Sequence, residues 1–394
     1  MRVVFINLQS NHLILKGMKT IRLHMNIPTK YTDFLKGLLD SDDVEVCNLI
    51  TKKGSVQIPQ KYGFFFPLLF FLNEANNVLK YNGIAKEKIT YITDFRDITP
   101  NDVVVGFIHS KGGCDELENI VGRKYLHINQ YQCHRIDIEE EKKWNLKGYI
   151  SEADLLHNKG LFADKHLKIN NKMIILPFIV APRFKRNTNY HNRKNKALAT
   201  GTLSMVSNEE YIDYYKSPYF HKMRIEIYKN MNKLQSTIDS LIMPYKEDTK
   251  SFCITQKDTI FMKYIKTFCN AIFYGQQKKY FSYNLVEKYN EYAMAIVPEE
   301  SIGLPAIGAF EAMACGCAYI GIDHKMYRDL GLIPNFHYIP YDGTVDGLKK
   351  TIEYYQINSK AAEIIANNGY HYVREKMNKK YVIQNFLSQI CSMK

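Results

Sequence analysis

Length, composition and charge narrow the classes of protein to which this chain can belong. Its 394 residues exceed what one compact core usually holds, so two domains are expected. The formal net charge of +13 favours anionic partners such as sugar nucleotides, nucleic acid or acidic lipid headgroups. The eight cysteines form no Cys-x2-Cys pair, and no apolar run reaches the ~20 residues that span a bilayer, which argues against a zinc finger, a disulfide scaffold and a membrane-spanning protein.

The first half alternates short apolar runs with polar loops, as expected of buried strands in an α/β domain. Strands are predicted at residues 2–8, 43–49, 102–109, 125–129, 147–151 and 173–178. His109 and His127 lie near the ends of two of these strands. A lone histidine at such a position is more often a structural group than a catalytic one, so both interpretations stay open.

One block in this half has an unusual composition. Residues 63–72, GFFFPLLFFL, contain five phenylalanines and three leucines. The simpler interpretation is a core helix or a pair of strands. The alternative is an exposed apolar lip that contacts a membrane surface, because Lys52, Lys53 and Lys61 precede it.

A polar and basic segment divides the chain. We place a first domain at residues 1–185, a linker at 186–196 and a second domain at 197–377, with a last helix at 378–394. The second domain opens with a strand at 197–203 that contains Gly201. Lys222 and Arg224 follow on a segment with helical spacing, and either could be an ordinary surface cation.

Residues 293–322 form the most informative stretch. An apolar strand at 293–297 runs into Pro298, and two carboxylates, Glu299 and Glu300, follow. A loop with glycines then leads to Glu311, which is expected to open a helix of small residues, and a second apolar strand follows at 318–322. This is a β-loop-α-β unit with its polar groups at the carboxyl end of a strand, where open parallel sheets bind ligands.

The run from Pro298 to Gly316 resembles the donor-nucleotide loop of GT-B glycosyltransferases, especially the large retaining family whose loop ends in Glu-Ala-Met-Ala-Cys-Gly. Residues 311–316 read EAMACG. In that family the second of two glutamates holds the nucleotide ribose, and this resemblance assigns that role to Glu311. The first glutamate should stand eight positions earlier, where this chain has Gly303, so the role of Glu300 is open.

The resemblance implies a GT-B fold, with two doubly wound α/β domains facing a central cleft and the tail helix crossing back onto the first domain. It implies transfer of a sugar from a nucleotide-diphosphate sugar to a glycan or lipid-linked acceptor, with retention of configuration. No metal or other cofactor is expected, since no Asp-x-Asp occurs in a plausible site. The implied catalytic groups are His127, His109 and Glu300. The implied donor-binding residues are Glu311, Glu299, Ser301, Gly303, Leu304, Gly308, Gly201, Lys222 and Arg224.

We further expect a cytoplasmic protein of bacterial surface polysaccharide synthesis, with peripheral contact to the inner face of the membrane and no nucleic-acid partner. Other interpretations stay open. Glu299, Glu300 and Ser301 are also similar to the Glu-Asn-Ser of fucosyltransferases that use a GDP-sugar, although the later Thr-Glu-Lys is missing. The remaining alternatives are a GT-B epimerase or phosphorylase, a GT-B-like binding protein without catalysis, and a basic nucleic-acid-binding protein.

Overall fold

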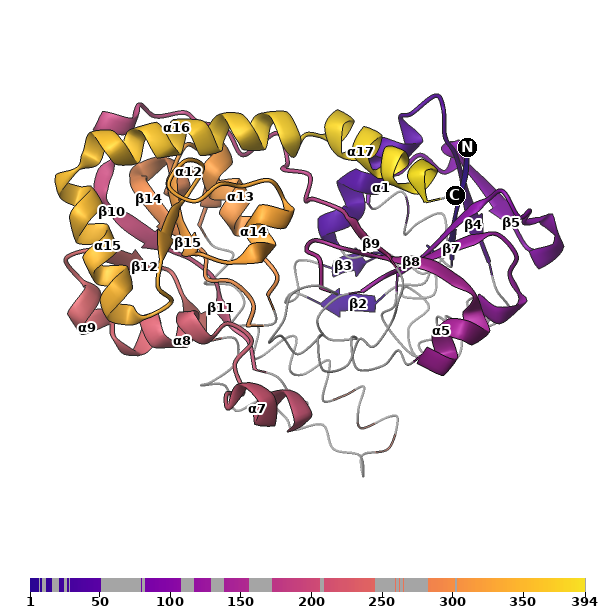
Figure 1. The fold of residues 1–394 in the computed structure, drawn as a ribbon, viewed down its shortest axis with the longest axis horizontal. Helices are drawn as coiled ribbons and strands as arrows, with labels where there is room; N and C mark the ends of the chain where they lie inside the picture. Colours follow the sequence, from indigo (N-terminus) through magenta and orange to yellow (C-terminus); the bar gives the residue numbers. More distant parts are fainter. Residues whose placement is uncertain are drawn as a thin grey trace.

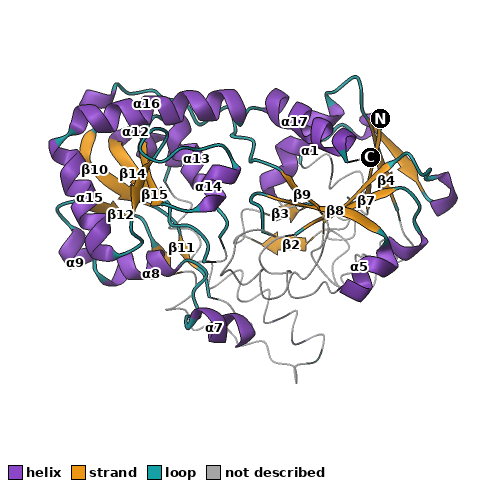
Figure 2. Ribbon diagram, viewed as in Figure 1, coloured by secondary structure: helices purple, strands orange, loops and turns teal. Residues whose placement is uncertain are grey.

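The chain builds two α/β units, each around a parallel sheet with helices packed on it (Figures 1 and 2). The computed structural model describes residues 1–6, 8, 12–15, 21–24, 27, 29–50, 79, 82–107, 117–128, 138–155, 172–205, 209–244, 259, 262, 265, 283–301 and 303–393. The phenylalanine-rich block at residues 63–72 and His109 lie outside the described residues.

The first unit contains a seven-stranded sheet in the order β5-β4-β1-β6-β7-β8-β9, and all neighbouring strands run parallel. Its central strands β1 and β6 are nearly continuous apolar runs, which suits a parallel sheet covered on both faces. Their bounds are β1 Arg2–Ile6, β4 Glu45–Leu49, β5 Ile89–Ile92, β6 Val103–Phe107, β7 Arg123–His127, β8 Leu146–Ser151 and β9 Lys172–Ile175.

Short helices and a small hairpin complete the described part of the first unit. The antiparallel pair is β2 His12–Leu15 with β3 Ile21–His24. The helices are η1 Thr29–Tyr31, α1 Thr32–Leu39, η2 Lys86–Lys88, η3 Phe95–Asp97, η5 Leu117–Asn119 and α5 Ile138–Trp144.

The second unit contains a five-stranded parallel sheet in the order β12-β10-β14-β15-β16. Its strands are β10 Lys194–Ala199, β12 Ile238–Ser240, β14 Tyr292–Ile296, β15 Ala318–Ile322 and β16 Ile339–Tyr341. A separate parallel pair joins β11 Thr202–Leu203 to β13 Met243–Pro244. The helices are η7 Tyr190–Asn192, α7 Glu209–Tyr215, α8 Lys222–Lys229, α9 Met231–Leu234, α12 Leu285–Glu291, α13 Ile307–Ala314, α14 Lys325–Asp329, α15 Val345–Ile357 and α16 Ser359–Lys376.

The order of the strands determines where the ligand-binding crevice of the second sheet is expected. In the second sheet β10 lies between β12 and β14, so the chain departs to opposite sides after these strands and their carboxyl ends form a topological switch point. Open α/β sheets bind ligands at such points. The predicted donor loop follows β14, and Gly201 follows β10.

A long helical tail connects the two units. α16 packs on α13 and β15 of the second unit, and α17 Lys379–Ser392 continues onto α1 and β9 of the first (Figure 1). The buried side chains of α17 belong to the same core cluster as those of β1 and β6. Another cluster runs through both units and includes Phe178 beside Phe310, with ring centroids 5.6 Å apart.

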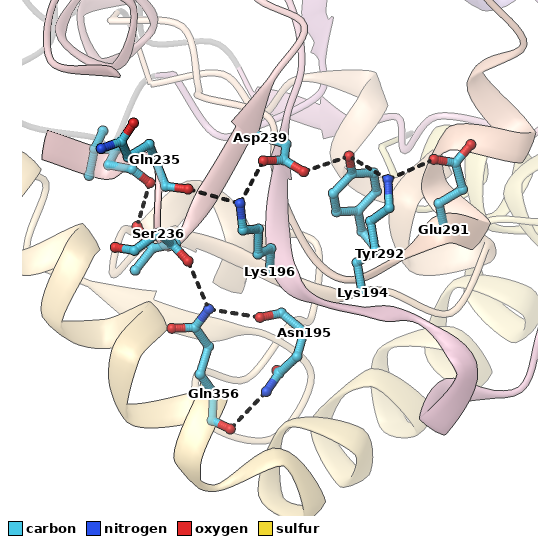
Figure 3. A network of polar contacts seen from close by, with 11 residues as sticks. Lys194, Asn195, Lys196, Gln235, Ser236, Asp239, Glu291, Tyr292 and Gln356 are labelled. Carbon is cyan, nitrogen blue, oxygen red and sulfur yellow. Dashed lines mark hydrogen bonds and ion pairs between the residues drawn. The ribbon is translucent and has the colours of Figure 1, made fainter. Parts of the chain in front are cut away.

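A network of polar contacts joins residues near the amino ends of the strands in the second sheet (Figure 3). Lys196 Nζ lies 2.9 Å from Asp239 Oδ1, and the Tyr292 hydroxyl donates to Asp239 Oδ2 at 2.9 Å. The Gln356 amide at the end of α15 donates to Asn195 O at 2.7 Å. β10 already pairs with β14 at Lys194, inside the segment predicted as linker, because its polar residues find partners in this network.

Within the described residues, no helix combines the length and apolar character required to cross a membrane.

Candidate active site

The loop after β14 is folded into a tight turn that fixes Glu300. The amide of Glu300 donates to Leu304 O at 3.1 Å, and the amide of Gly303 donates to Glu300 O at 3.0 Å. Gly303 has φ +84, which suits glycine because a side chain there would be strained. The Ser301 amide donates to Phe220 O at 2.8 Å, so the turn is also tied to the segment before α8. The Gly303 amide thus has a partner inside the loop.

The two consecutive carboxylates point to different surroundings. Glu299 is 8% exposed, and its Oε1 accepts hydrogen bonds from the Tyr327 hydroxyl at 2.6 Å and the Ile322 amide at 2.9 Å. Burial raises the pKa of Glu299, and the bond from Tyr327 opposes that rise. Glu299 therefore joins the end of β14 to β15 and α14. Glu300 is half-buried and interacts with charges of the first unit.

Glu311 lies in the second turn of α13 rather than at its head. The helix begins at Ile307 after Ala306, since Pro305 and the extended Ala306 end the loop four residues before the expected start. Gly308 in the first turn lets α13 pack closely, because a Cβ there would lie 3.0 Å from Val297 Cγ1. Burial raises the pKa of Glu311 to about 7, and the positive charge of Arg183 opposes the rise.

Arg224 and Lys222 occupy different environments at the start of α8. Lys222 is exposed, whereas Arg224 is 6% exposed and its Nη1 donates to Thr202 O at 3.1 Å. The guanidinium packs on Gly201, where a Cβ would lie 2.6 Å from Arg224 Cζ. Gly201 also has φ +140, so both conformation and space require glycine there. Arg224 thus places a buried positive charge at the carboxyl end of β10.

His127 belongs to a buried polar cluster of the first unit. The histidine ends β7 and is 1% exposed, and its Nε2 lies 3.0 Å from the Tyr31 hydroxyl. Glu152 follows β8, is completely buried, and places Oε2 3.9 Å from His127 Nε2 and Oε1 in an ion pair with Lys30. Burial acts to raise the pKa of Glu152, but Lys30 and His127 hold it below its usual value.

Electrostatic interactions connect this cluster to the loop after β14 in the second unit. Burial raises the pKa of Glu300 to about 8; the positive charges of Lys30 and Arg224 oppose this rise, and the negative charge of Glu152 adds to it. Glu300 also raises the pKa of Tyr31, after the larger effects of burial and of Glu152. Charged groups from both units therefore converge on Glu300.

Several residues of this constellation were not assigned to a site from the sequence. They are Lys30, Tyr31, Glu152 and Arg183. Only Glu152 carries a usable signal, because a carboxylate directly after a buried strand is the same pattern as Glu299 and Glu300. Among the described residues, no group of three or more His, Cys, Asp or Glu side chains is placed to hold a metal ion.

A protein family and several solved structures are similar to this chain. The model of glycosyl transferase family 90 matches residues 312–391, directly after Glu311. No curated protein matches the chain. A glycosyltransferase from Rickettsia africae is similar in structure, with a TM-score of 0.50, 11% identity, and coverage of 100% of this chain and 98% of that one. Anabaena Alr3699/HepE in complex with UDP-glucose has a TM-score of 0.53, 9% identity, and coverage of 100% of both chains.

These likenesses cover the whole chain, and the chain has two parallel-sheet α/β units, so the GT-B fold predicted from the sequence is confirmed.

Proposed function

We propose that this protein is a glycosyltransferase that moves a sugar from a nucleotide-diphosphate sugar to a glycan or lipid-linked acceptor. The observation that carries the proposal is the convergence of Glu300, Arg224 and the Lys30–Glu152 pair where the two units meet. The family match over residues 312–391 supports it, as does the UDP-glucose bound to the HepE structure.

The reaction breaks the bond between the anomeric carbon and the diphosphate oxygen and forms a bond to an acceptor hydroxyl oxygen. The nucleoside diphosphate leaves with the electron pair, and the hydroxyl proton is released. Arg224 would neutralise the leaving diphosphate, because a guanidinium matches phosphate geometry. Fixed charges that face the developing charge are a large source of rate enhancement.

The other assignments follow from their environments. Glu300 would bind donor-sugar hydroxyls, since the Oε1 of Glu299 is already occupied by Tyr327 and Ile322. Glu311 would hold the ribose, with Arg183 facing it. His127 would orient Tyr31 and the sugar from the first unit. The reaction would proceed without a metal or other cofactor.

The test is a thermal-shift panel of UDP-, GDP-, CMP- and dTDP-sugars, in which a true donor raises the melting temperature by mass action. Arg224→Ala should abolish the shift, while Lys229→Ala, an exposed cation on the same helix, should preserve it. A panel with no shift at millimolar donor would refute the proposal.

The finer assignments concern stereochemistry and place in the cell. We propose retention of configuration and a role in bacterial surface polysaccharide synthesis at the inner face of the cytoplasmic membrane, without a nucleic-acid partner. The anomeric coupling constant of the product distinguishes retention from inversion. Incubation of the donor without acceptor would expose an epimerase. Co-sedimentation with phosphatidylglycerol vesicles, against phosphatidylcholine vesicles as control, tests the membrane contact.

A further inference from the structure

The loop that follows β8 contacts both the buried polar cluster of His127 in its own unit and the second unit. β8 ends at Ser151, and the next residue, Glu152, pairs with Lys30 inside the first unit. Two residues later the amide of Asp154 donates to Asp329 Oδ2 of α14 at 3.0 Å, across the boundary between the units. Lys325 Nζ lies 3.7 Å from Asp154 Oδ2 and also pairs with Asp329.

On the other side of this contact, α14 is held by the donor loop. Tyr327 of α14 donates its hydroxyl proton to Glu299 Oε1, and the Ile322 amide before α14 donates to the same oxygen. Glu299 directly precedes Glu300. The contacts therefore run from Glu299 through α14 to Asp329 and then to Asp154. Two residues earlier, Glu152 pairs with Lys30, whose positive charge acts on Glu300.

The exposed fractions of the side chains indicate which of Asp329, Lys325 and Asp154 can fix the position of the loop. The side chain of Asp329 is 9% exposed, against 43% for Lys325 and 20% for Asp154. A carboxylate that accepts from a backbone amide makes a charge-assisted bond, which is shorter and stronger than a neutral one. Asp329 is nearly buried and accepts such a bond from the first unit, so it holds the loop that contains Glu152 in one position.

We propose that Asp329 is a positioning residue for glycosyl transfer: through its bond to the Asp154 amide it fixes the loop of Glu152 and thereby sets Lys30 opposite Glu300. This inference rests on the proposed function. Donor binding belongs to Arg224, Glu300 and Glu311 of the second unit, whereas the step that needs both units aligned depends on Asp329.

Kinetics of three variants test the role. Asp329→Ala should lower kcat by about 10- to 100-fold, the scale expected when reacting groups are slightly misplaced, with little change in the donor dissociation constant. Asp329→Asn should recover part of this loss, because its amide oxygen still accepts from Asp154. Lys325→Ala should cost less than Asp329→Ala, since the bond to Asp154 remains.

The matched control is Asp323→Ala. Asp323 lies just before α14 and pairs with the exposed Arg328. Its removal takes a carboxylate from the same region without touching Asp154, so kcat should stay at the wild-type value. A wild-type kcat in Asp329→Ala, or equal losses of kcat in Asp329→Ala and Asp323→Ala, would overturn the proposal.

Two readouts do not need turnover and so separate this inference from the proposed function. In Asp329→Ala, hydrogen exchange of the Asp154 amide should be faster than in the wild type, because the bond is lost. In Asp329→Asn the increase should be smaller, because the side-chain amide oxygen still accepts from Asp154. Acylation of the Lys30 amine by N-hydroxysuccinimidyl acetate should also be faster, with Lys142 as an exposed reference. Unchanged exchange and labelling would refute the positioning route even if the wild type transfers sugar. Faster exchange and labelling in a protein that transfers no sugar would refute the proposed function and leave the structural route standing.

Discussion

At the scale of single residues, the candidate site keeps two carboxylates under conditions that favour their protonated form. The pKa of Glu300 is raised to about 8 and that of Glu311 to about 7, in both cases chiefly by burial. Lys30 and Arg183 oppose these shifts without cancelling them. Protein sites that bind or transform ligands often show such perturbed groups.

This burial predicts a pH dependence of stability. A carboxyl whose pKa is higher in the folded than in the unfolded chain binds its proton more tightly when folded, so stability falls as pH rises from about 4.5 through the folded values. Glu311→Gln should therefore reduce the loss of unfolding free energy between pH 5.5 and 8.5 by about 1–2 kcal/mol. Urea denaturation at both pH values measures it. Equal losses in variant and wild type would contradict the prediction.

Gly321 provides a steric test of the Glu299 cluster. A Cβ at this position would lie 3.0 Å from both Glu299 Oε1 and the Tyr327 hydroxyl, and 2.9 Å from Tyr319 Cε1. The Tyr327 hydroxyl is hydrogen-bonded to Glu299 Oε1 and to the Tyr319 hydroxyl, so the three side chains cannot easily move apart. Gly321→Ala should cost about 1–3 kcal/mol of unfolding free energy, the usual scale of overpacking.

A double-mutant cycle identifies the cause of that cost. Tyr327→Phe removes the hydroxyl that the new methyl group would meet, so Gly321→Ala should cost less in the Tyr327→Phe background. The same cost in both backgrounds would show that the clash lies elsewhere.

At the scale of elements, the second sheet carries the candidate site at one edge and a network of stabilising polar contacts at the other. Gly201, Arg224 and the Glu300 turn lie at the carboxyl ends of β10 and β14. The network in Figure 3 lies at the amino ends and ties these strands to β12 and α15. Changes at the amino ends should therefore alter stability and leave ligand binding unaffected.

Asp239→Asn tests this separation. It removes the ion pair with Lys196 and weakens the bond from Tyr292, which should lower the free energy of unfolding by about 1 kcal/mol. The donor-induced thermal shift should stay unchanged. Glu353→Gln on α15 is the control, because its exposed pair with Lys349 should contribute about 0.5 kcal/mol or less. Loss of donor binding in Asp239→Asn would contradict the separation.

At the scale of the whole molecule, the tail helix makes the stability of the first unit depend on the end of the chain. Phe386 of α17 packs edge-on against Phe34 of α1, with ring centroids 4.8 Å apart. Gly37 allows this approach, since a Cβ there would lie 2.7 Å from Ile383 Cγ1. The contacts join positions that are more than 300 residues apart in sequence.

Truncation of that contact should destabilise the first unit. Phe386→Ala should lower the free energy of unfolding by about 3–5 kcal/mol, as large-to-small core substitutions do. Gln384→Ala, on the exposed face of the same helix, should change it little. Chemical denaturation followed by Trp144 fluorescence in the first unit checks both. A small effect of Phe386→Ala would show that α17 is not needed there.

The sequence by itself determined the class of fold and the two strands of the second unit that flank α13. Apolar runs punctuated by glycine and proline identified the strands around 293–297 and 318–322, because burial and turn formation depend on local residue types. The same local signals placed Gly201 and Glu300 at strand ends. They missed where α13 begins, because the chain stays extended through Ala306 and reaches helical geometry only at Ile307.

The tertiary structure alone decided which polar groups meet. Successive side chains of an extended chain point to opposite sides, so one of Glu299 and Glu300 had to turn inward, and Tyr327 and the Ile322 amide selected Glu299. Lys30 and Glu152 are 122 residues apart and reach Glu300 only when the two units pack together. No local pattern encodes that meeting, because it depends on how the two sheets are held together by the tail helix, by the shared core cluster and by the bond between Asp154 and Asp329.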